Sequence, residues 1–395
     1  MRSSTRRTIL WTLALVLGLV LVAVAYVRGG DDSGSAVTAP DSPSPQVPDD
    51  PGEGCGAAAS TDPEDLAVDR TLARCEAGAP APRPLARATT VRVAITERTE
   101  TVAPVLVAEA LDEFAADGLA VDIVDLSRAE AYARLGRGGV DVVVGGMDGP
   151  FFDAVDGGLG ARLVLGGQVA RRPSDLDTPQ PGFWIRKGLL SDDGEDWDNV
   201  EGQTVLVPGG ITAAATLPID TLLAQHALDG NAIDIVPAPS AQAAETLRVA
   251  AAGGAWLAEP DATQAAADEA LMLVATTPGS EAIDGTVFGP RLLGPERTAG
   301  LAYVRAVIRT INTHLADGYG DDALAALSDA LAVDEEVVAD GPAPLFDWEI
   351  RAGTTTRVQD TLTSLGGVGY ERVIAENRLV DRSLAADVVA AADQR

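Results

Sequence analysis

The sequence predicts an α/β protein of two lobes, each built on a βαβαβ sheet flanked by helices. Short apolar segments alternate with amphipathic segments from Val91 onwards, which is the order of strands and helices in parallel sheets. The same order then occurs a second time, from Thr204. The glycine pairs at Gly138 and Gly253 precede the third strand of each copy at nearly the same distance from its start. This constant spacing indicates two lobes with one plan.

The first copy ends in an apolar strand followed by two glycines, in the run GGVDVVVGGMDGPFF at 138–152. Glycines at a strand end allow another group to approach the backbone closely, so the run predicts a strand that opens onto a pocket. The strands expected in this copy are Val91–Ile95, Val121–Leu126 and Val140–Gly145, and the helices are Val102–Phe114 and Arg128–Leu135.

The second copy repeats these elements and predicts the other wall of a cleft. Its expected strands are Thr204–Val207, Ile233–Val236 and Ala255–Ala258, and its helices are Ala213–Leu228 and Ala241–Ala252. Ligands of such folds bind beyond the carboxyl ends of the strands, beside helix N-termini. The loops Met147–Phe152 and Glu259–Asp261 are therefore expected to face each other across the cleft.

The rest of the chain is helical by its apolar spacing. Helices are expected over residues 296–317, 321–331, 335–338, 355–365 and 379–393. They are interpreted as returning to lobe 1. The expected boundaries are 89–175 for the first part of lobe 1, 176–282 for lobe 2 and 283–395 for the lobe 1 return and C-terminal helices.

Residues 1–27 predict a transmembrane anchor or a signal sequence. Arg2, Arg6 and Arg7 precede an apolar run from Thr8 to Val27, and twenty helical residues span roughly 30 Å, the thickness of a bilayer core. The basic residues place the N-terminus inside and the bulk of the chain outside the cytoplasm. A signal-peptidase site at 23–25 is the alternative, with a secreted or periplasmic protein as the result.

Residues 28–54 predict a flexible linker, because they are rich in Pro, Ser, Gly and Asp and have no apolar period. An extension over 55–88 follows and contains Cys55 and Cys75, the only cysteines in the sequence. In an oxidising compartment two cysteines this close in sequence are expected to form a disulfide. No metal site is expected of them.

Composition excludes several classes of function. The net charge is −30, from 29 basic and 59 acidic residues, which argues against a nucleic-acid partner. The two histidines, His226 and His314, fall in predicted helices, and no G-x-S-x-G motif or Cys/His pair is present. We therefore expect no enzyme activity, no cofactor and no metal.

An ordered series of segments carries a resemblance to a known family. The segments are VRVAI, GLAVDIVDL, EAYARLGRGGVDVVVGGMDGPFFDAV, ARLVLGG, VEGQTVLVPGGITAAATLPIDTLLAQHALD and GGAWLAEPDATQAA. Over roughly Thr90–Asp393 the chain resembles the type II periplasmic-type substrate-binding proteins of ABC importers, in the branch for nitrate, sulfonates, taurine and thiamine-pyrimidine precursors. The resemblance implies two crossovers between the lobes, near 170–182 and 276–288, hinged closure on a ligand, and an ABC importer permease as partner.

Thirteen residues are candidates for ligand binding because they lie at predicted strand ends. They are Glu97, Thr99, Thr101, Met147, Asp148, Phe151, Gln168, Gly209, Gly210, Ile211, Thr212, Trp256 and Glu259. Each also has a plain structural alternative, such as a tight turn, a helix cap, a solvated loop or a core position. Free amides at 208–212 would suit an anion, whereas the carboxylates and aromatic rings favour an amine or a heteroaromatic compound. The ligand class therefore stays open between sulfonate, amine and heteroaromatic compounds.

The function that these observations favour is an extracytoplasmic solute-binding protein. It would capture a small organic molecule between its lobes and deliver it to an ABC importer, while the N-terminal helix holds it at the membrane. A membrane-tethered ligand sensor is the alternative, and an enzyme on the same scaffold is disfavoured by the missing pair of nucleophile and base.

Overall fold

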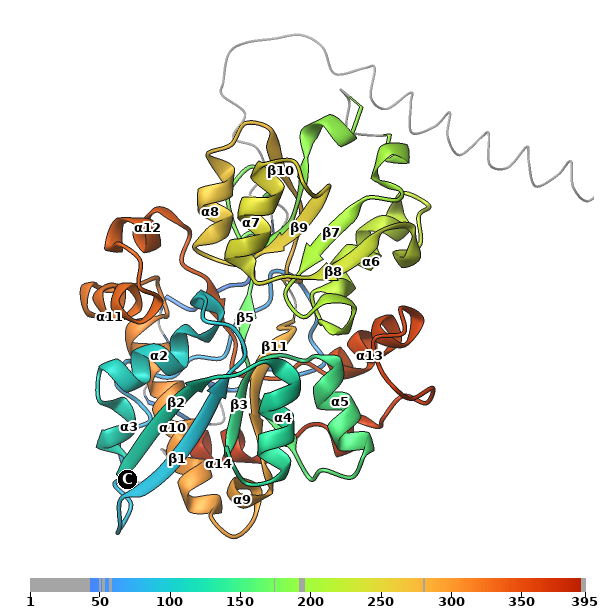
Figure 1. Cartoon of the computed structure of the whole chain (residues 1–395). Coiled ribbons are helices and arrows are strands. Elements are labelled where there is room, and N and C mark those ends of the chain that lie inside the picture. Colours follow the sequence, from blue (N-terminus) through green and yellow to red (C-terminus); the bar gives the residue numbers. More distant parts are fainter. Residues whose placement is uncertain are drawn as a thin grey trace, which may run out of the picture. The chain divides into compact units, whose positions relative to one another are not determined.

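Two five-stranded sheets, one in each lobe, form the framework of the chain. The structure is a computed structural model whose described part belongs to one compact unit of the chain. It describes residues 43–49, 51, 54–56, 59–173, 175–191, 196–279 and 281–391. The two-lobed α/β class is confirmed, since each lobe holds a mixed sheet with helices packed beside it (Figure 1).

The lobe 1 sheet has the strand order β2-β1-β3-β11-β4. Its strands are β1 (Thr89–Ile95), β2 (Leu119–Asp125), β3 (Val142–Gly146), β4 (Arg162–Gly166) and β11 (Asp284–Phe288). β1 pairs in parallel with β2 and β3, as the βαβαβ plan requires, whereas β11 runs antiparallel to both β3 and β4. β11 lies within the segment predicted to be the second crossover, so that crossover is shorter than expected.

The helices of lobe 1 connect its parallel strands. They are α2 (Ala103–Ala110), α3 (Glu113–Ala116), α4 (Arg128–Gly136) and α5 (Gly149–Asp156). Asp112 has a left-handed backbone conformation (φ 58°) between α2 and α3. The single helix predicted over 102–114 is therefore divided in two.

The lobe 2 sheet has the order β10-β6-β9-β7-β8. Its elements are β6 (Gly182–Arg186), β7 (Thr204–Val207), α6 (Thr216–Gln225), β8 (Asp234–Pro237), α7 (Ser240–Arg248), β9 (Gly254–Leu257), α8 (Asp261–Ala266) and β10 (Leu271–Thr276). β7 pairs in parallel with β8 and β9, and β6 is antiparallel to β9 and β10. The parallel part again follows the predicted plan.

The chain passes between the sheets twice. It leaves lobe 1 after β5 (Gln168–Val169), crosses through residues 170–181, and returns through 277–283. β5 pairs with β12 (Leu345–Phe346) of the C-terminal region. The return segment leads directly into β11, so the second crossover is anchored in the middle of the lobe 1 sheet.

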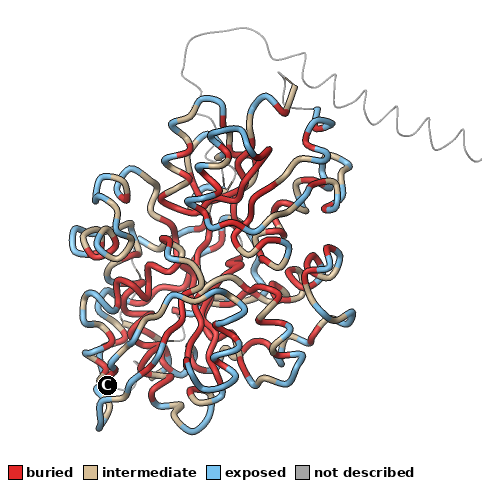
Figure 2. Tube along the Cα trace, viewed as in Figure 1, coloured by how far each residue is buried: buried red, intermediate tan, exposed pale blue. Residues whose placement is uncertain are grey.

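The C-terminal helices pack mainly on lobe 1. They are α9 (Pro290–Leu293), α10 (Arg297–His314), α11 (Asp321–Leu331), α12 (Glu335–Asp340), α13 (Thr354–Ser364) and α14 (Ser383–Ala390). α10 contacts α2, α3 and α14, and α11 contacts α2. α13 differs, because it contacts both α5 of lobe 1 and α6 of lobe 2. Figure 2 shows the buried residues concentrated along the strands and the inner faces of the helices.

A buried ion cluster fixes α10 against lobe 1. Asp117 is 0% exposed and accepts hydrogen bonds from Arg305 Nε at 2.6 Å and from Arg309 Nη1 at 2.9 Å. Arg309 also pairs with Glu113 of α3. Because breaking a buried pair leaves an unpaired charge, these contacts hold the C-terminal helices in place strongly.

The extension before β1 is closed by an internal disulfide and is tied to the rest of the chain by a buried ion pair. Cys55 and Cys75 form the predicted disulfide, with their Cα atoms 4.6 Å apart. Arg70 donates to Asp347 at 2.7 Å, and both side chains are buried. The extension thus packs on the segment that follows β12.

The predicted anchor or signal at 1–27 and most of the predicted linker at 28–54 lie outside the described residues. Within the part that the structure describes, no helix has both the length and the apolar character needed to cross a bilayer.

Removing the disulfide is expected to lower stability. The double variant Cys55→Ser/Cys75→Ser frees a loop of the unfolded chain, so the free energy of unfolding should fall by about 2–4 kcal/mol. Urea unfolding of oxidised protein measures this, and dithiothreitol-treated wild type is the matched control. An unchanged midpoint in the double variant would show that the extension contributes no such constraint.

Candidate functional site

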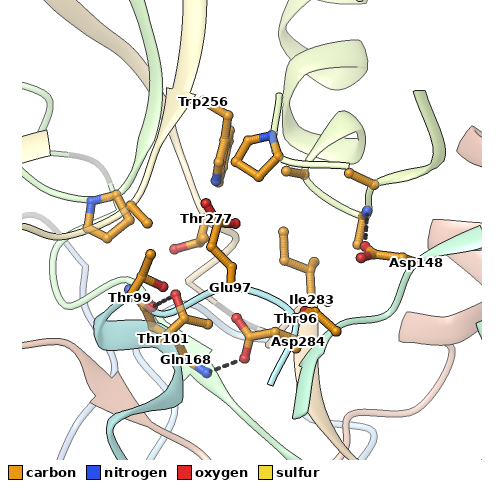
Figure 3. Close-up of a pocket in the computed structure, with 18 of the residues that line it drawn as sticks. Thr96, Glu97, Thr99, Thr101, Asp148, Gln168, Trp256, Thr277, Ile283 and Asp284 are labelled. Carbon is orange, nitrogen blue, oxygen red and sulfur yellow. Dashed lines mark hydrogen bonds between the residues drawn. The ribbon is translucent and has the colours of Figure 1, made fainter. Parts of the chain in front are cut away.

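A cavity of about 80 Å³ lies between the two lobes. Its lining comes from the ends of strands in both sheets and from both crossovers, as Figure 3 shows. Parallel strands end at one edge of a sheet, and here the two edges face each other, in the place that such folds use for ligands.

Two carboxylates of lobe 1 reach across to backbone amides of lobe 2. Glu97 lies two residues after β1, and its Oε1 accepts a hydrogen bond from Ser240 N at 2.8 Å. Asp148 lies two residues after β3, and its Oδ1 accepts one from Ala214 N at 2.9 Å. β1 and β3 are neighbours in the sheet, so their ends bring both carboxylates to the same wall of the cavity.

Arg128, at the start of α4, lies between these carboxylates. Its Nε donates to Asp148, and its Nη2 lies 3.5 Å from Glu97 Oε2. Burial raises the pKa of Glu97, although the hydrogen bond from Ser240 and the guanidinium of Arg128 both oppose that change. The trio carries a net negative charge when both carboxyls are ionised.

A chain of polar side chains forms the wall beside the crossovers. Thr101 Oγ1 donates to Gln168 Oε1 at 2.9 Å, and Gln168 N donates to Asp284 Oδ1 at 2.8 Å. Asp284 is the first residue of β11 and is 7% exposed. Burial raises its pKa to about 7, despite the hydrogen bond from Gln168.

Some polar groups of the cavity have no partner in the described part of the chain. The hydroxyls of Thr96 and Thr277 are buried and form no hydrogen bond there, and Thr277 is 5% exposed. Trp256 of β9 extends from lobe 2 toward the centre of the cavity in Figure 3. An occupant would therefore meet two lining residues whose hydroxyls form no other hydrogen bond in the described part of the chain.

A larger groove of about 780 Å³ adjoins the cavity. The two share Thr96, Glu97, Arg128 and Pro208 in their lining. The ion pairs of Arg128 therefore lie at the boundary between the cavity and the groove.

Six of the thirteen candidate residues line the cavity. These are Glu97, Thr99, Thr101, Asp148, Gln168 and Trp256. They come from the ends of β1 and β3, from β5 and from β9.

Met147 and Phe151 do not line the cavity. Met147 is 1% exposed and belongs to the apolar core. Phe151 is 0% exposed, and its ring centroid lies 5.9 Å from that of Tyr132 and 5.2 Å from that of Phe152. Met147 and Phe151 are both buried in this core, so Phe151 and Phe152 serve packing at this position.

The predicted anion site at 208–212 is not open to a ligand at its helix start. A 3-10 turn occupies Gly210–Thr212, α6 begins only at Thr216, and the free amide of Ala214 is taken by Asp148. The Thr212 hydroxyl donates to Gly209 O at 2.9 Å. Of the candidates here, Gly209 and Thr212 line the adjoining groove, Gly210 is buried against Pro237, and Ile211 is exposed.

Sequence reasoning missed Arg128, Ser240, Thr277 and Asp284. Arg128 and Ser240 begin helices directly after strands, a position that could have suggested them. Thr277 begins the second crossover and Asp284 directly follows it, and neither carries a local motif. Only their distant strand pairing brings them to the cavity.

Glu259 lies outside the cavity lining, in a buried carboxyl cluster between the lobes. Glu100 N donates to Glu259 O at 3.2 Å, and Tyr319 Oη donates to Glu100 Oε2 at 2.6 Å. Glu259 Oε2 accepts from Thr263 N, and its Oε1 is buried without a partner in the described chain. Burial raises the pKa of Glu100 to about 8 and that of Glu259 to about 7.

This cluster predicts that stability falls as pH rises from 5 to 8. The unfolded chain loses these protons near pH 4.3, whereas the folded chain keeps them to about 7–8, so the folded state holds more protons within that window. In Glu100→Gln/Glu259→Gln the decline should be shallower, with about 1–3 kcal/mol more stability than wild type at pH 8. Urea unfolding at pH 5.5 and 8 measures this.

The matched control is Glu130→Gln, which removes an exposed carboxyl of α4 that pairs with Arg134. It should leave the pH dependence of unfolding as in wild type. An equally steep decline in the double variant would contradict the role given to the buried pair.

Comparison with known proteins identifies the fold. No family model matches the chain, and no curated protein matches it either. The ligand-binding component of an ABC-type import system from Staphylococcus aureus, with zinc bound, has a TM-score of 0.62 and 11% identity, over 76% of this chain and 99% of that one.

Two further solved structures have a similar fold. The alkanesulfonate-binding protein SsuA from Xanthomonas axonopodis pv. citri, bound to MOPS, has a TM-score of 0.57 and 13% identity, over 75% of this chain and 99% of that one. The periplasmic nitrate-binding protein NrtA from Synechocystis PCC 6803 has a TM-score of 0.59 and 15% identity, over 78% and 90%. The chain therefore has the fold of the type II periplasmic binding proteins of ABC importers.

Proposed function

We propose that this protein is an extracytoplasmic solute-binding protein, which captures a small organic molecule between its lobes and delivers it to an ABC importer. The observation that carries the proposal is a cavity walled by both lobes and both crossovers. An occupant of this cavity would contact each lobe at once, so its binding energy would favour the closed arrangement over an open one.

The crossovers provide the means for the lobes to move. Only residues 170–181 and 277–283 connect β5 and β10 to the opposite sheets, and hinge closure in two-lobed proteins takes place in such short segments. Thr277 and Ile283 belong to the second segment and also line the cavity. Ligand contacts and hinge geometry are therefore coupled through the same residues.

The membrane partner follows from the same proposal. The permease of an importer would recognise the closed lobes, and the apolar segment at 1–27 would keep the protein at the membrane. Neither step calls for catalysis by this chain, and the lining residues that the structure describes include no nucleophile paired with a base.

The names of the similar structures suggest a sulfonate or nitrate as solute. Such anions need positive charge, and the cavity of this chain is mainly acidic. Glu97, Asp148 and Asp284 line it, and Arg128 is the one basic side chain among the described lining residues. The class of solute is therefore argued separately below.

A ligand screen tests the proposed function. The full chain should melt at a higher temperature with at least one compound from a panel of amines, polyamines, amino acids, aminopyrimidines, alkanesulfonates, taurine and nitrate. A ligand at one hundred times its dissociation constant adds about 2.7 kcal/mol, which differential scanning fluorimetry detects. The compound should be recovered unchanged after incubation.

Trp256→Ala should weaken binding of that compound at least tenfold, since it removes the lobe 2 aromatic wall of the cavity. Val249→Ala, at an exposed position after α7, is the control and should bind as wild type does. Absence of any shift across the panel in folded protein, or chemical conversion of the ligand, would refute the proposal.

A further inference from the structure

We infer that the solute held in the interlobe cavity is a small organic cation, a protonated amine, with the Asp284 carboxylate as its counter-ion. This inference rests on the proposed function, because it names the class of solute for that same cavity. Four observations support it: occupied amides, the balance of charge, an incompletely paired carboxyl, and unpartnered hydroxyls.

The lobe 2 amides that would suit an anion are already in use. Ala214 N donates to Asp148, and Ser240 N, at the start of α7, donates to Glu97. An anionic solute would have to displace a carboxylate of the protein from each of these amides. Arg128 could bind such an anion only by giving up a contact with Asp148 or Glu97.

The charge of the cavity favours a cation. Three carboxyl groups and one guanidinium are the ionisable groups among the described lining residues. Arg128 is held by Asp148 and Glu97, so its charge is balanced within the protein. An incoming anion would therefore meet an excess of negative charge in a site of low dielectric, where like charges repel strongly.

Asp284 is the carboxyl that lacks a charged partner. Its Oδ1 accepts from Gln168 N, and no hydrogen bond to its Oδ2 exists within the described chain. The side chain is nearly buried, so its ionised form is disfavoured until a cation comes close. An ammonium group beside Oδ2 would form the charge-assisted hydrogen bond that this carboxyl lacks.

The remaining groups complete a site for a donor. An ammonium carries three N–H donors and no acceptor, and the unpartnered hydroxyls of Thr277 and Thr96 can accept from it. The side chain of Trp256 extends into the same space, and aromatic rings attract cations. Thr277 is more than nine-tenths buried, so its hydroxyl has no access to bulk water as a substitute.

Size and ligand number separate an amine from a metal ion. A cavity of about 80 Å³ has room for a small organic molecule and not only for a single ion. Within the described residues no group of three or more His, Cys, Asp or Glu side chains is arranged to hold a metal. The site therefore fits an organic cation better than a bare one.

Matched probes test the charge of the solute. Calorimetric titration of the full chain would compare 1-propylamine with 1-propanesulfonate, and ethanolamine with ethylene glycol, with nitrate and zinc chloride as further arms. The amines should bind at least tenfold more tightly than the sulfonate, the diol, nitrate or Zn²⁺. A preference for sulfonate, nitrate or Zn²⁺ would overturn the inference and leave the proposed function standing.

The pH dependence gives a second readout of charge. Between pH 6 and 8 the amines stay protonated while Asp284 ionises, so their affinity should rise several-fold. Glu97, Asp148 and Arg128 are the other charged groups among the described residues that line this cavity. Amine affinity that falls over this range would count against Asp284 as the counter-ion.

Variants locate the contact. Asp284→Asn keeps the acceptor for Gln168 N and should weaken amine binding at least tenfold, whereas Thr277→Val should weaken it about threefold with the charge intact. Glu245→Gln, at an exposed position of α7 that pairs with Arg248, is the control and should bind normally. Unchanged amine affinity in folded Asp284→Asn would overturn the inference. If no probe binds folded wild type, the inference is overturned, and the wider ligand panel described above decides the proposed function separately.

Should Asp284→Asn fail to melt cooperatively, Thr277→Val decides the question. A hydroxyl that only packs in the wall would leave amine affinity unchanged when replaced by a methyl group. That result would remove Thr277 from the site and overturn the arrangement proposed here.

Discussion

The pairing of β11 between β3 and β4 is the constraint on which the rest of the structure depends. It draws the chain back from lobe 2 into the centre of the lobe 1 sheet, so the second crossover is held at its end by two sets of backbone hydrogen bonds. The same pairing sets Asp284 opposite Gly146 and beside the cavity. The strand that follows the second crossover thus also carries the residue to which the solute is assigned.

Hydrogen bonds between the two lobes stabilise their present arrangement, as a ligand bound between them would. Glu97 and Asp148 bring negative charge to lobe 2 amides, and hydrogen bonds to charged groups contribute about 1.5–3 kcal/mol each. Arg128 offsets the cost of burying both carboxylates together. The present arrangement of the lobes is therefore stabilised by the protein's own groups. In the proposed function, a solute would add only the difference in its affinity for closed and open states.

Much of the fold followed from local sequence, because apolar period and glycine position are local properties. The repeated strand–helix order predicted both parallel sheets, and the strand ends predicted Glu97, Asp148 and Trp256 as candidates that do line the cavity. β11 was missed because the short run DGTVF forms a strand by pairing with β3 and β4, which are distant from it in the sequence. Met147 was chosen for its place in the loop, yet its amide continues the pairing by donating to Ile283 O, and its side chain is part of the core.

The charge of the whole chain has a different effect from the charge of the cavity. A net charge of −30 attracts cations over long distances and repels anions, which would raise the encounter rate of an amine at low ionic strength. That field is screened within roughly 8 Å at physiological salt, so it cannot discriminate between bound solutes. Discrimination must come from groups shielded from water, and Asp284 and Thr277 are such groups. The acidic surface can therefore bring cations to the groove, but the cavity has to select among them.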